Sequence, residues 1–505
     1  MRTVNGTEKK CLIGVDVGTT SQKVAVFDTD GNTLAAVNVD YILDTRGNTV
    51  EFDACEYISI LRRGLTAAAW KAFPGAGEEE LRERVAAISI DTQGETLIVT
   101  GGDNSPLRPA IVWLDNRADA QAKEIDARFG RERVYEVTGQ PEIVATWPAC
   151  KLAWLRENEP EMFSGTERIF LLEDWLLWAL SGQFVTEPTV QSSTIYLDIR
   201  QRTWWGEMLD EVGISERQLP RIVPSGTVIG YADPAWLCGG GTAGVPADGG
   251  IPVVTGALDQ VAGAIGAGVV REGIVSEMTG TTMTVFAPTG GIPPYDASSI
   301  MPCHLTYDGS YALLSWTPTA GIALKWFRNK FCPELSFREL DELAEKVEPG
   351  SAGLVFLPYL CGSTMPKYDP DARGVFYGLT MEHGREHMAR AILESVAAML
   401  RATLDYLDVR CEEIRTMGGG ALSPLWCGIK ADMCGRRLVT LKNTDTACLG
   451  AAILGGVGVG LFPSVEEACD CIVATDREYI PAPSEASEAA YRAYTAADDR
   501  IYPQA

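Results

Sequence analysis

The chain has 505 residues, an apolar content of 46% and a formal net charge of −25. This length exceeds what one hydrophobic core usually organises, so two large domains are expected. The negative charge repels polyanions, which excludes nucleic acid and anionic membranes as expected partners. The first ten residues lack the apolar segment of a signal peptide, and no run is apolar enough to span a bilayer.

Thirteen cysteines are scattered along the chain without paired Cys-x-x-Cys spacing. An odd number of cysteines in mostly apolar surroundings is typical of reduced, buried thiols in a cytoplasmic protein. Two short groups, Cys469 with Cys471 and His383 with His387, lack further clustered ligands. Structural roles are therefore favoured over zinc binding at both places.

The first half begins as a β-meander, in which apolar and other residues alternate around short polar turns. A helical spacing, a buried strand, a strand that leads into a helix, and two further helices come next. The second of these helices ends at Gly182, a typical helix terminator. The expected segments are 11–20, 22–28 and 33–40 for the meander, then 57–73, 84–91, 110–129, 148–158 and 173–182.

Near residue 252 the strand pattern starts again. A strand at 251–259, a small-residue helix at 260–268 and a strand–turn–strand unit at 273–288 precede a long helix at 385–407. A strand, a glycine turn, a helix and another strand then fill 412–441, with Ser423 as the expected helix N-cap. The turn Thr-Gly-Thr-Thr at 279–282 echoes the turn of the first hairpin. Two related α/β halves with a cleft between them are therefore expected.

The first hairpin places Asp16 directly before a turn of glycine and hydroxyl residues. Such a turn exposes a carboxylate that can hold hydrated Mg²⁺ beside backbone amides that can meet phosphate oxygens. An ordinary hairpin with an acidic residue at its turn is the alternative. The second hairpin and the Gly418–Gly420 turn favour the phosphate interpretation, because three such turns are spread over both halves.

The chain resembles the FGGY family of carbohydrate kinases from about residue 12 to about residue 460. Residues 374–394, GVFYGLTMEHGREHMARAILE, fit the C-terminal signature of that family, and 146–158 fit its N-terminal signature except at Thr146. Residues 356–379 also resemble xylulokinases. The resemblance implies two RNase H-like domains of the actin/Hsp70/hexokinase superfamily with an interdomain catalytic cleft. The implied division is a sugar-binding domain at 1–253, a nucleotide-binding domain at 254–480 and a C-terminal tail at 481–505.

The resemblance also assigns site residues. Asp16 matches the residue near the transferred phosphoryl group and Mg²⁺, and Asp259 matches the catalytic base, although a helix N-cap role for Asp259 stays open. Trp113, Asp115 and Arg117 match a position below the cleft, where an internal Asp–Arg brace is favoured over substrate contact. The implied phosphate- and nucleotide-binding residues are Thr19, Thr20, Gly280, Thr281, Gly321, Gly419, Gly420, Ala421 and Ser423.

The implied sugar-binding residues are Gln93, Glu95, Asp259 and Gln260. Thr92–Gln93 stands where xylulokinases carry Met-His, and Gly94 stands where glycerol kinases carry Arg. The expected activity is ATP-dependent, Mg²⁺-dependent phosphorylation of a pentulose such as D-xylulose, and the alternative is a glycerol, tetritol or other polyol kinase. An ATP-driven chaperone or filament protein and an inactive sugar-binding regulator are the competing classes. A homodimer is compatible with the sequence.

Overall fold

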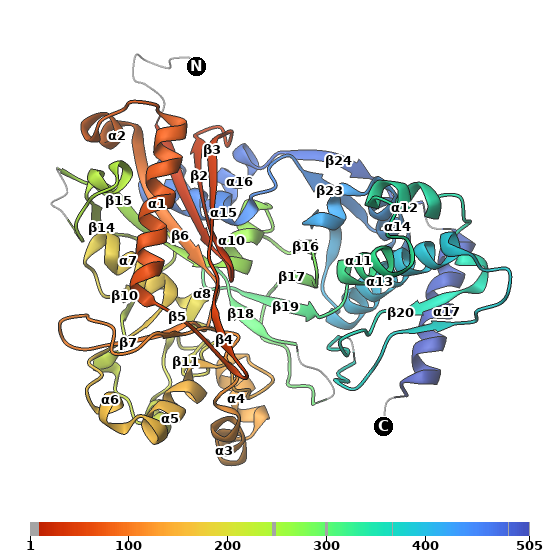
Figure 1. The fold of residues 1–505 in the computed structure, drawn as a ribbon, viewed down its shortest axis with the longest axis horizontal. Coiled ribbons are helices and arrows are strands. Elements are labelled where there is room, and N and C mark those ends of the chain that lie inside the picture. Colours follow the sequence, from red (N-terminus) through yellow and green to blue (C-terminus); the bar gives the residue numbers. More distant parts are fainter. Residues whose placement is uncertain (1–9, 245–248, 298–300, 366, 483, 504–505) are drawn as a thin grey trace.

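The computed structural model describes residues 10–244, 249–297, 301–365, 367–482 and 484–503. Most of the first ten residues, where the signal-peptide pattern is missing, therefore lie outside the described part. Two large sheets occupy the two halves of the molecule, which lie side by side in Figure 1. The early elements form one half and the green to blue elements form most of the other.

The N-terminal sheet has six strands. Its spatial order is β14 (Val228–Ala232), β15 (Ile251–Leu258), β6 (Val85–Thr92), β1 (Cys11–Val17), β2 (Ser21–Asp28) and β3 (Thr33–Asp40). The meander β1–β2–β3 is antiparallel, whereas β6 pairs in parallel with both β1 and β15. The meander expected from the alternating sequence pattern is therefore confirmed.

The C-terminal sheet has seven strands. Its spatial order is β18 (Cys303–Leu305), β19 (Tyr311–Thr317), β17 (Met283–Thr289), β16 (Gly273–Thr279), β22 (Cys411–Met417), β23 (Arg437–Leu441) and β24 (Thr475–Tyr479). The strands β16, β17 and β19 form an antiparallel meander, and β22 and β23 continue it in parallel. This repeats the strand order of β1, β2, β3, β6 and β15, so both halves share one topology, as the two similar turns predict.

Helices cover both sheets and fill their edges. In the first half they are α1 (Ala54–Ala72), α2 (Glu78–Arg84), α7 (Leu172–Ser181), α8 (Pro188–Gln191) and α10 (Asp259–Gly266). The second half of the chain contributes α11 (Gly321–Phe331), α12 (Phe337–Ala344), α13 (Arg385–Leu407), α14 (Pro424–Cys434), α15 (Thr446–Gly458), α16 (Val465–Ile472) and α17 (Glu485–Ile501), of which α15 packs on β1, β6 and β15 of the N-terminal sheet. Gly182 ends α7, and Ser423 and Gly435 cap the two ends of α14, as expected from the sequence. Among the described residues, no helix combines the length and the apolar character needed to cross a membrane.

A lobe is inserted between β6 and α7. It contains the five-stranded sheet β4 (Asp44–Arg46), β5 (Thr49–Phe52), β8 (Ala110–Ile111), β7 (Leu97–Thr100) and β9 (Arg168–Leu171), of which β4 and β5 come from the preceding connection. Its helices are α3 (Asp119–Phe129), α4 (Arg131–Thr138), α5 (Pro148–Asn158) and α6 (Pro160–Ser164), followed later in the chain by α9 (Gly206–Val212). Short two-stranded pairs complete the fold: β10 (Val185–Thr186) with β13 (Arg221–Ile222), β11 (Leu197–Asp198) with β12 (Thr203–Trp204), and β20 (Val355–Leu357) with β21 (Val375–Tyr377).

The division between the halves lies later than the sequence suggests. The expected boundary after residue 253 falls inside β15, which pairs with β6 and β14 of the N-terminal sheet. The structure therefore places the division after α10. Residues 481–505, expected as a tail, include α17, which packs on the C-terminal core through the buried side chain of Tyr494.

Two helices from different halves cross at the junction. A Cβ added at Gly266 of α10 would lie 1.8 Å from the Thr446 carbonyl oxygen, and one at Gly450 of α15 would lie 1.9 Å from the Ala262 carbonyl oxygen. A Cβ at Gly14 of β1 would lie 1.8 Å from the Cys448 carbonyl oxygen. In Figure 1 the blue α15 accordingly lies beside the red strands of the first half. Backbone thus contacts backbone where the halves meet, which only glycine permits.

Candidate active site

Three carboxylates stand at the ends of three neighbouring parallel strands. Asp16 lies near the end of β1, Asp91 lies opposite it in the β1–β6 register, and Asp259 directly follows β15. Because carboxyl ends of parallel strands meet at one edge of a sheet, the fold gathers these groups. Asp259 is the first residue of α10, and its Oδ1 accepts a hydrogen bond from Gln260 N over 2.6 Å. Leu258 therefore occupies the N-cap position of α10 without a side-chain capping bond, and the alternative role of Asp259 as the helix N-cap is wrong.

The pKa values of all three acids are raised, mainly by burial. Burial raises the pKa of Asp259 to about 7, and the charges of Asp16 and Glu95 add to the increase. Burial is also the main reason that the pKa of Asp16 is raised, against the lowering effect of Lys23. For Asp91, which is fully buried, burial and then the charges of Asp16 and Asp259 hold the pKa well above its usual range. A carboxyl with a pKa near 7 is suited to accept a proton at neutral pH.

The same edge fits a hydrated divalent cation. Both carboxylate oxygens of Asp91 are buried without a hydrogen-bond donor, and Asp16 is its immediate neighbour. Oxygen ligands of this kind are those that Mg²⁺ prefers. The described residues contain no group of three His, Cys, Asp or Glu side chains that could hold a metal ion. Mg²⁺ at Asp16 therefore depends on water and substrate phosphates for its remaining ligands, which is its usual mode with nucleotides.

The loop after β6 carries the expected sugar-binding residues. Gln93 is buried with no hydrogen-bond partner for either side-chain amide atom. Glu95 has a left-handed backbone with φ of 59°, which is uncommon for a residue other than glycine. The fully buried Lys151 of α5 donates from Nζ to the carbonyl oxygens of Glu95 and Val112, at 3.0 Å each. Unsatisfied polar groups and a strained loop residue together favour a ligand-binding role for this loop.

An aromatic side chain connects this loop to the first hairpin. Trp113 Nε1 donates to Thr19 Oγ1 over 3.0 Å, and the Trp113 backbone N donates to Thr96 Oγ1 over 3.2 Å. The Thr19 hydroxyl is thus already engaged, whereas Thr20 is exposed at the turn. Trp113 therefore lies between the expected sugar loop and the expected phosphate turn.

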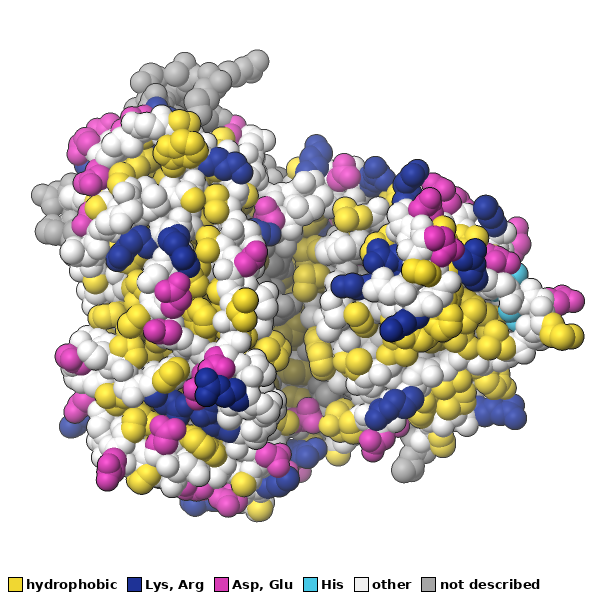
Figure 2. Space-filling view, in the orientation of Figure 1, with side chains coloured by type: hydrophobic (Ala, Val, Ile, Leu, Met, Phe, Trp, Pro, Cys, Tyr) yellow, Lys and Arg dark blue, Asp and Glu magenta, His cyan; other side chains and the backbone are white. Residues whose placement is uncertain are grey.

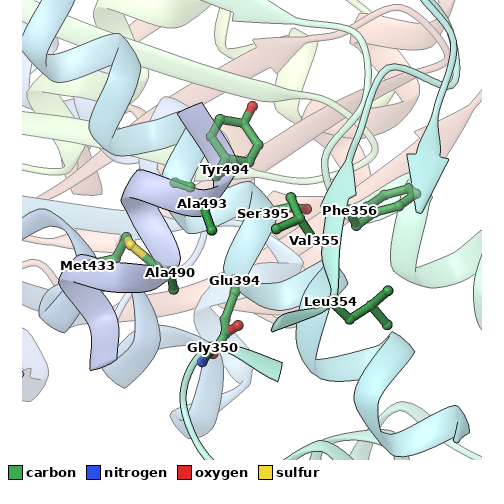
Figure 3. Close-up of a pocket in the computed structure, with 12 residues that line it drawn as sticks. Gly350, Leu354, Val355, Phe356, Glu394, Ser395, Met433, Ala490, Ala493 and Tyr494 are labelled. Carbon is green, nitrogen blue, oxygen red and sulfur yellow. The ribbon is translucent and has the colours of Figure 1, made fainter. Parts of the chain in front are cut away.

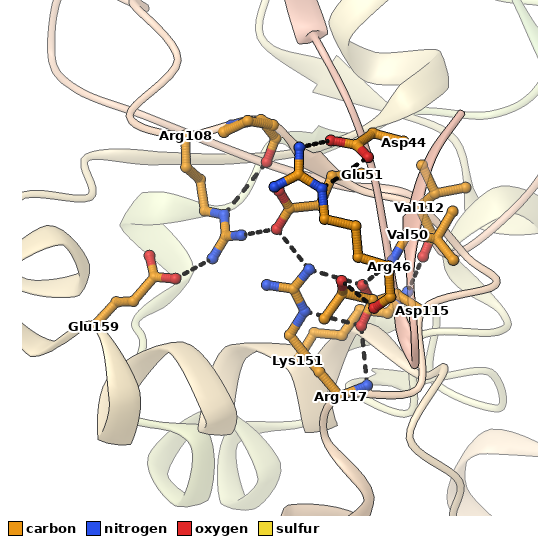
Figure 4. A network of polar contacts seen from close by, with 12 residues as sticks. Asp44, Arg46, Val50, Glu51, Arg108, Val112, Asp115, Arg117, Lys151 and Glu159 are labelled. Atoms are coloured by element: carbon orange, nitrogen blue, oxygen red, sulfur yellow. Dashed lines mark hydrogen bonds and ion pairs between the residues drawn. The ribbon is translucent and has the colours of Figure 1, made fainter. Parts of the chain in front are cut away.

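A network of ion pairs supports the loop from below (Figure 4). Asp115 is fully buried, accepts from Val50 N at 2.6 Å and pairs with Arg117 at 2.8 Å. Glu51 of β5 lies between the guanidinium groups of Arg117 and Arg108. The interpretation of Asp115 and Arg117 as an internal brace is therefore confirmed by their contacts.

The second hairpin faces the Gly418 turn and the start of α11. A Cβ at Gly321 would lie 2.2 Å from the Gly280 carbonyl oxygen, and one at Gly420 would lie 2.7 Å from the Cβ of Thr279. Thr281 is exposed, and its carbonyl oxygen accepts from Ile322 N over 3.1 Å. Three segments that the sequence separates by up to about a hundred and forty residues thus form one compact glycine-lined surface. Glycine permits the backbone to approach a phosphate or a ribose closely.

A buried ion pair lies beneath this surface. Lys430 of α14 and Glu277 of β16 are both fully buried, and their Nζ–Oε distances are 3.0 Å. Lys430 also donates to Thr279 Oγ1 over 2.8 Å, and Thr416 donates to Glu277 over 2.6 Å. The pair therefore joins β16, β22 and α14 directly under the second hairpin.

A cleft separates the two halves in Figure 2. Beside the Gly418 turn lies a cavity of about 340 Å³, lined by Met417, Ala421, Thr446 and Arg477 among others. Another cavity, of about 20 Å³, lies among α13, α17 and β20 and is shown in Figure 3. Its size suits one water molecule and not a metabolite, so the C-terminal core offers no alternative site there.

The structure groups the predicted residues into two sets. Asp16, Gln93, Glu95 and Asp259 lie on the N-terminal side, and Gly280, Thr281, Gly321, Gly419 and Gly420 lie on the C-terminal side. Ser423 instead uses its hydroxyl to cap α14, accepting from Trp426 N over 3.0 Å. The individual ligand-binding roles of all these residues stay predictions.

Four residues near the site were not identified from the sequence: Asp91, Lys23, Lys151 and Lys430. Lys23 lies opposite Asp16 in the β1–β2 ladder and pairs with Asp445 at 2.7 Å. Asp91 lies near the end of the buried strand β6, and this position could have indicated a site residue from the sequence. Lys151 and Lys430 gave no such signal, because an isolated lysine in a helix is usually exposed.

Comparison with known proteins identifies the family to which this chain belongs. The N-terminal domain of the FGGY family of carbohydrate kinases matches residues 11–266, and its C-terminal domain matches 278–459. A xylulose kinase of Lactococcus lactis is 31% identical over 94% of this chain and 93% of its own length. A glycerol kinase of Thermococcus onnurineus is 31% identical over 90% of each chain. The crystal structure of a gluconate kinase from Lactobacillus acidophilus superposes with a TM-score of 0.87 at 27% identity, covering 98% of both chains.

The fold and the two-sided site thus define an ATP-dependent sugar kinase with two domains of the actin/hexokinase type. The chain belongs to the FGGY family of carbohydrate kinases. The expectation drawn from the two signature segments is confirmed. The chaperone, filament and regulator alternatives are not needed.

Proposed function

We propose that the protein transfers the γ-phosphoryl group of ATP to a hydroxyl of a neutral pentulose such as D-xylulose. The observation that carries this proposal is the environment of Asp259. It follows β15 at the edge where Asp16 and Asp91 gather, and its pKa is raised to about 7 by burial and by Asp16. A base with that pKa accepts a hydroxyl proton efficiently at neutral pH.

The proposed reaction divides its tasks between the two halves. Asp259 accepts the proton as the sugar oxygen bonds to the γ-phosphorus and the bond to the ADP oxygen breaks. The hairpins at 18–20 and 280–282 and the Gly418–Gly420 turn present backbone amides to the phosphates. Mg²⁺, held near Asp16 by water and phosphate oxygens, supplies neutralisation of phosphate charge when bound. Most of the rate enhancement then comes from alignment and electrostatics, as is general for phosphoryl transfer.

The charge of the site supports a neutral sugar over a sugar acid. The carboxyl groups of Asp16, Asp91, Glu95 and Asp259 act electrostatically on one another. The nearby cation Lys151 already donates to two backbone carbonyl oxygens. A substrate carboxylate would add repulsion at this edge, whereas hydroxyls suit the amide of Gln93 and the carboxylate of Glu95. Glycerol or a tetritol is the second candidate, because the Gln93–Glu95 pair needs only two adjacent hydroxyls.

A coupled assay of ADP release tests the substrate directly. D-Xylulose, a second pentulose, glycerol, erythritol and gluconate are compared at equal concentrations with MgATP in excess. We expect the largest kcat/KM for a pentulose and the smallest for gluconate. A larger value for gluconate contradicts the charge argument, and a larger value for glycerol selects the second candidate.

Three further expectations, on location, Mg²⁺ dependence and assembly, accompany this function. A cytoplasmic location follows from the use of ATP, Mg²⁺ dependence follows from the acids at the strand ends, and a homodimer is the proposed assembly to test. Subcellular fractionation, a Mg²⁺ titration and light scattering measure them separately.

A further inference from the structure

The strand that carries Asp259 leaves the sheet irregularly. The parallel ladder pairs Thr255 with Ile90 and then Leu258 with Thr92, with a register shift between the two pairs. At the shift, a Cβ added at Gly256 would lie 1.9 Å from the Ile90 carbonyl oxygen, so only glycine fits. The amides of the bulged segment need partners outside the ladder, because a buried unpaired N–H is costly.

Two side chains supply those partners. Glu173 of α7 accepts from Gly256 N over 3.0 Å, and Thr189 Oγ1 of α8 accepts from Leu258 N over 2.7 Å. Thr189 in turn donates its hydroxyl proton to Glu187 over 2.7 Å. Glu173, Glu187 and Thr189 are all fully buried. The backbone amide of Gly256 is thus held by Glu173, and that of Leu258 is held by Thr189, which is itself bonded to Glu187.

The two acids are unequally supplied with donors. Glu187 accepts from Thr189 N at 2.8 Å, Val190 N at 2.6 Å and Ser225 Oγ at 2.7 Å, in addition to the Thr189 hydroxyl. Glu173 accepts one backbone bond, and its Oε2 is buried with no donor. Four donors stabilise an ionised carboxylate at Glu187, whereas Glu173 lacks them.

Only acids are found among the groups that raise the pKa of Glu173. The charges of Glu187 and of Asp174, its neighbour on α7, act on it. After burial itself, these charges hold the pKa of Glu173 well above its usual range. The shortage of donors at Glu173, against four donors at Glu187, favours the neutral form of Glu173.

We propose that Glu173 is a positioning residue for catalysis: as a neutral acid it accepts from Gly256 N, and so fixes the bulge of β15 that orients Asp259. The proposal rests on the proposed role of Asp259 as the base. Glu173 itself does not contact the reacting atoms. A displacement of the base by about 1 Å is enough to lower turnover on the order of 100-fold.

Two substitutions distinguish the effect of the negative charge at Glu173 from the effect of losing its side-chain acceptor. Glu173→Gln keeps an acceptor for Gly256 N and carries no charge, so it mimics the neutral acid. Glu173→Ala removes the acceptor. We expect Glu173→Gln to keep kcat within about threefold of wild type, and Glu173→Ala to lose roughly 10- to 100-fold in kcat with little change in either KM. Glu394→Gln, a buried acid bonded to Arg390 at 2.8 Å in the other half, is the matched control and should leave kcat unchanged.

Infrared spectroscopy tests the proton independently of activity. Near pH 8, the carbonyl band of protonated carboxyl groups should lose the intensity of one group in Glu173→Gln and none in Glu394→Gln. An unchanged band in Glu173→Gln overturns the neutral acid. Wild-type kcat in a folded Glu173→Ala, or equal losses in the Gln and Ala variants, overturns the positioning role. If Asp259→Asn keeps its activity, the base assignment fails, while the infrared result still decides where the proton lies.

Discussion

The two halves of this kinase repeat one strand order but end their strands in different chemistry. At the ends of β1, β6 and β15 stand Asp16, Asp91 and Asp259. The equivalent strands of the other half, β16, β22 and β23, lead into the Gly280 hairpin, the Gly418 turn and a polar loop. One scaffold therefore offers acids that can accept a proton on one side and bare backbone for phosphates on the other. Function here depends on the residues at the end of each strand and not on the fold itself.

The buried lysines extend the comparison. Lys151 supports the sugar loop through two backbone carbonyl oxygens, and burial lowers its pKa to about 7. Lys430 supports the phosphate hairpin through a full ion pair with Glu277. Each of the two turns proposed to bind ligand thus contacts a buried lysine, but only Lys430 has a buried counter-charge at hydrogen-bond distance.

The largest effect should come from Asp259→Asn. Removing a positioned base costs roughly 10²–10⁴-fold in rate, because the sugar hydroxyl then has no proton acceptor. Steady-state kcat with the best sugar of the panel measures it, and circular dichroism checks the fold. Retention of wild-type kcat would mean that the acidic side does not supply the base.

Lys430→Met should destabilise the protein more than Lys151→Met. The first leaves the Glu277 charge buried without its cation, which costs about 3–5 kcal/mol. The second leaves two carbonyl groups without donors, which costs about 1–3 kcal/mol. Urea unfolding followed by tryptophan fluorescence compares the midpoints of both variants with wild type. Equal midpoints would show that the buried ion pair adds nothing beyond hydrogen bonds.

Gly321→Ala should damage the ATP side selectively. Its Cβ would lie 2.2 Å from the Gly280 carbonyl oxygen, so the phosphate hairpin must shift. We expect kcat/KM for ATP to fall on the order of 100-fold, while the KM for the sugar changes little. Gly428→Ala in α14 is the control, because nothing lies within 4 Å of its added Cβ. A rise in the KM for the sugar together with the KM for ATP would contradict the assignment of ATP binding to the C-terminal half alone.

Glu95→Ala should have the opposite selectivity. Loss of a buried hydrogen-bond partner for a sugar hydroxyl costs about 1–3 kcal/mol, which appears mainly as a raised KM for the sugar. Initial rates over both substrate concentrations give the two KM values. The role in sugar binding is excluded by an equal rise in the KM for ATP.

The smallest effect is a pH dependence from Asp259. Its pKa is raised to about 7, and only the ionised form accepts a proton. Activity should therefore be half-maximal near pH 7, approach its full value toward pH 8 and above, and fall toward a slope of about tenfold per pH unit on the acid side. The pH profile of kcat/KM for the sugar measures this limb. A flat profile from pH 8 to pH 5.5 would require a different base.

Local sequence patterns predicted the elements and the turns well, since they depend on neighbouring residues. Alternation identified the meander, and Ser423, Pro424 and Gly435 marked the helix α14. Asp259 was identified because its position after a strand matches the family pattern. The domain boundary was misplaced because β15 pairs with β6, about 160 residues earlier, and such long-range pairing leaves no local trace.

The supporting residues were missed for a related reason. Lys151, Lys430 and Glu173 have charged side chains that are usually solvated, so their sequence positions predict exposure. Their burial follows from contacts with Val112, Glu277 and Gly256, which become neighbours only after both sheets have formed. Polar groups that support a site from beneath are therefore visible only in three dimensions.

The glycine crossing of α10 and α15 has a consequence for closure of the cleft. Gly266 and Gly450 bring the backbones of the two helices into direct contact. Sliding of one helix along the other would drive carbonyl oxygens into helix backbone, so we expect the halves to move by rotation about this crossing and not by translation along it.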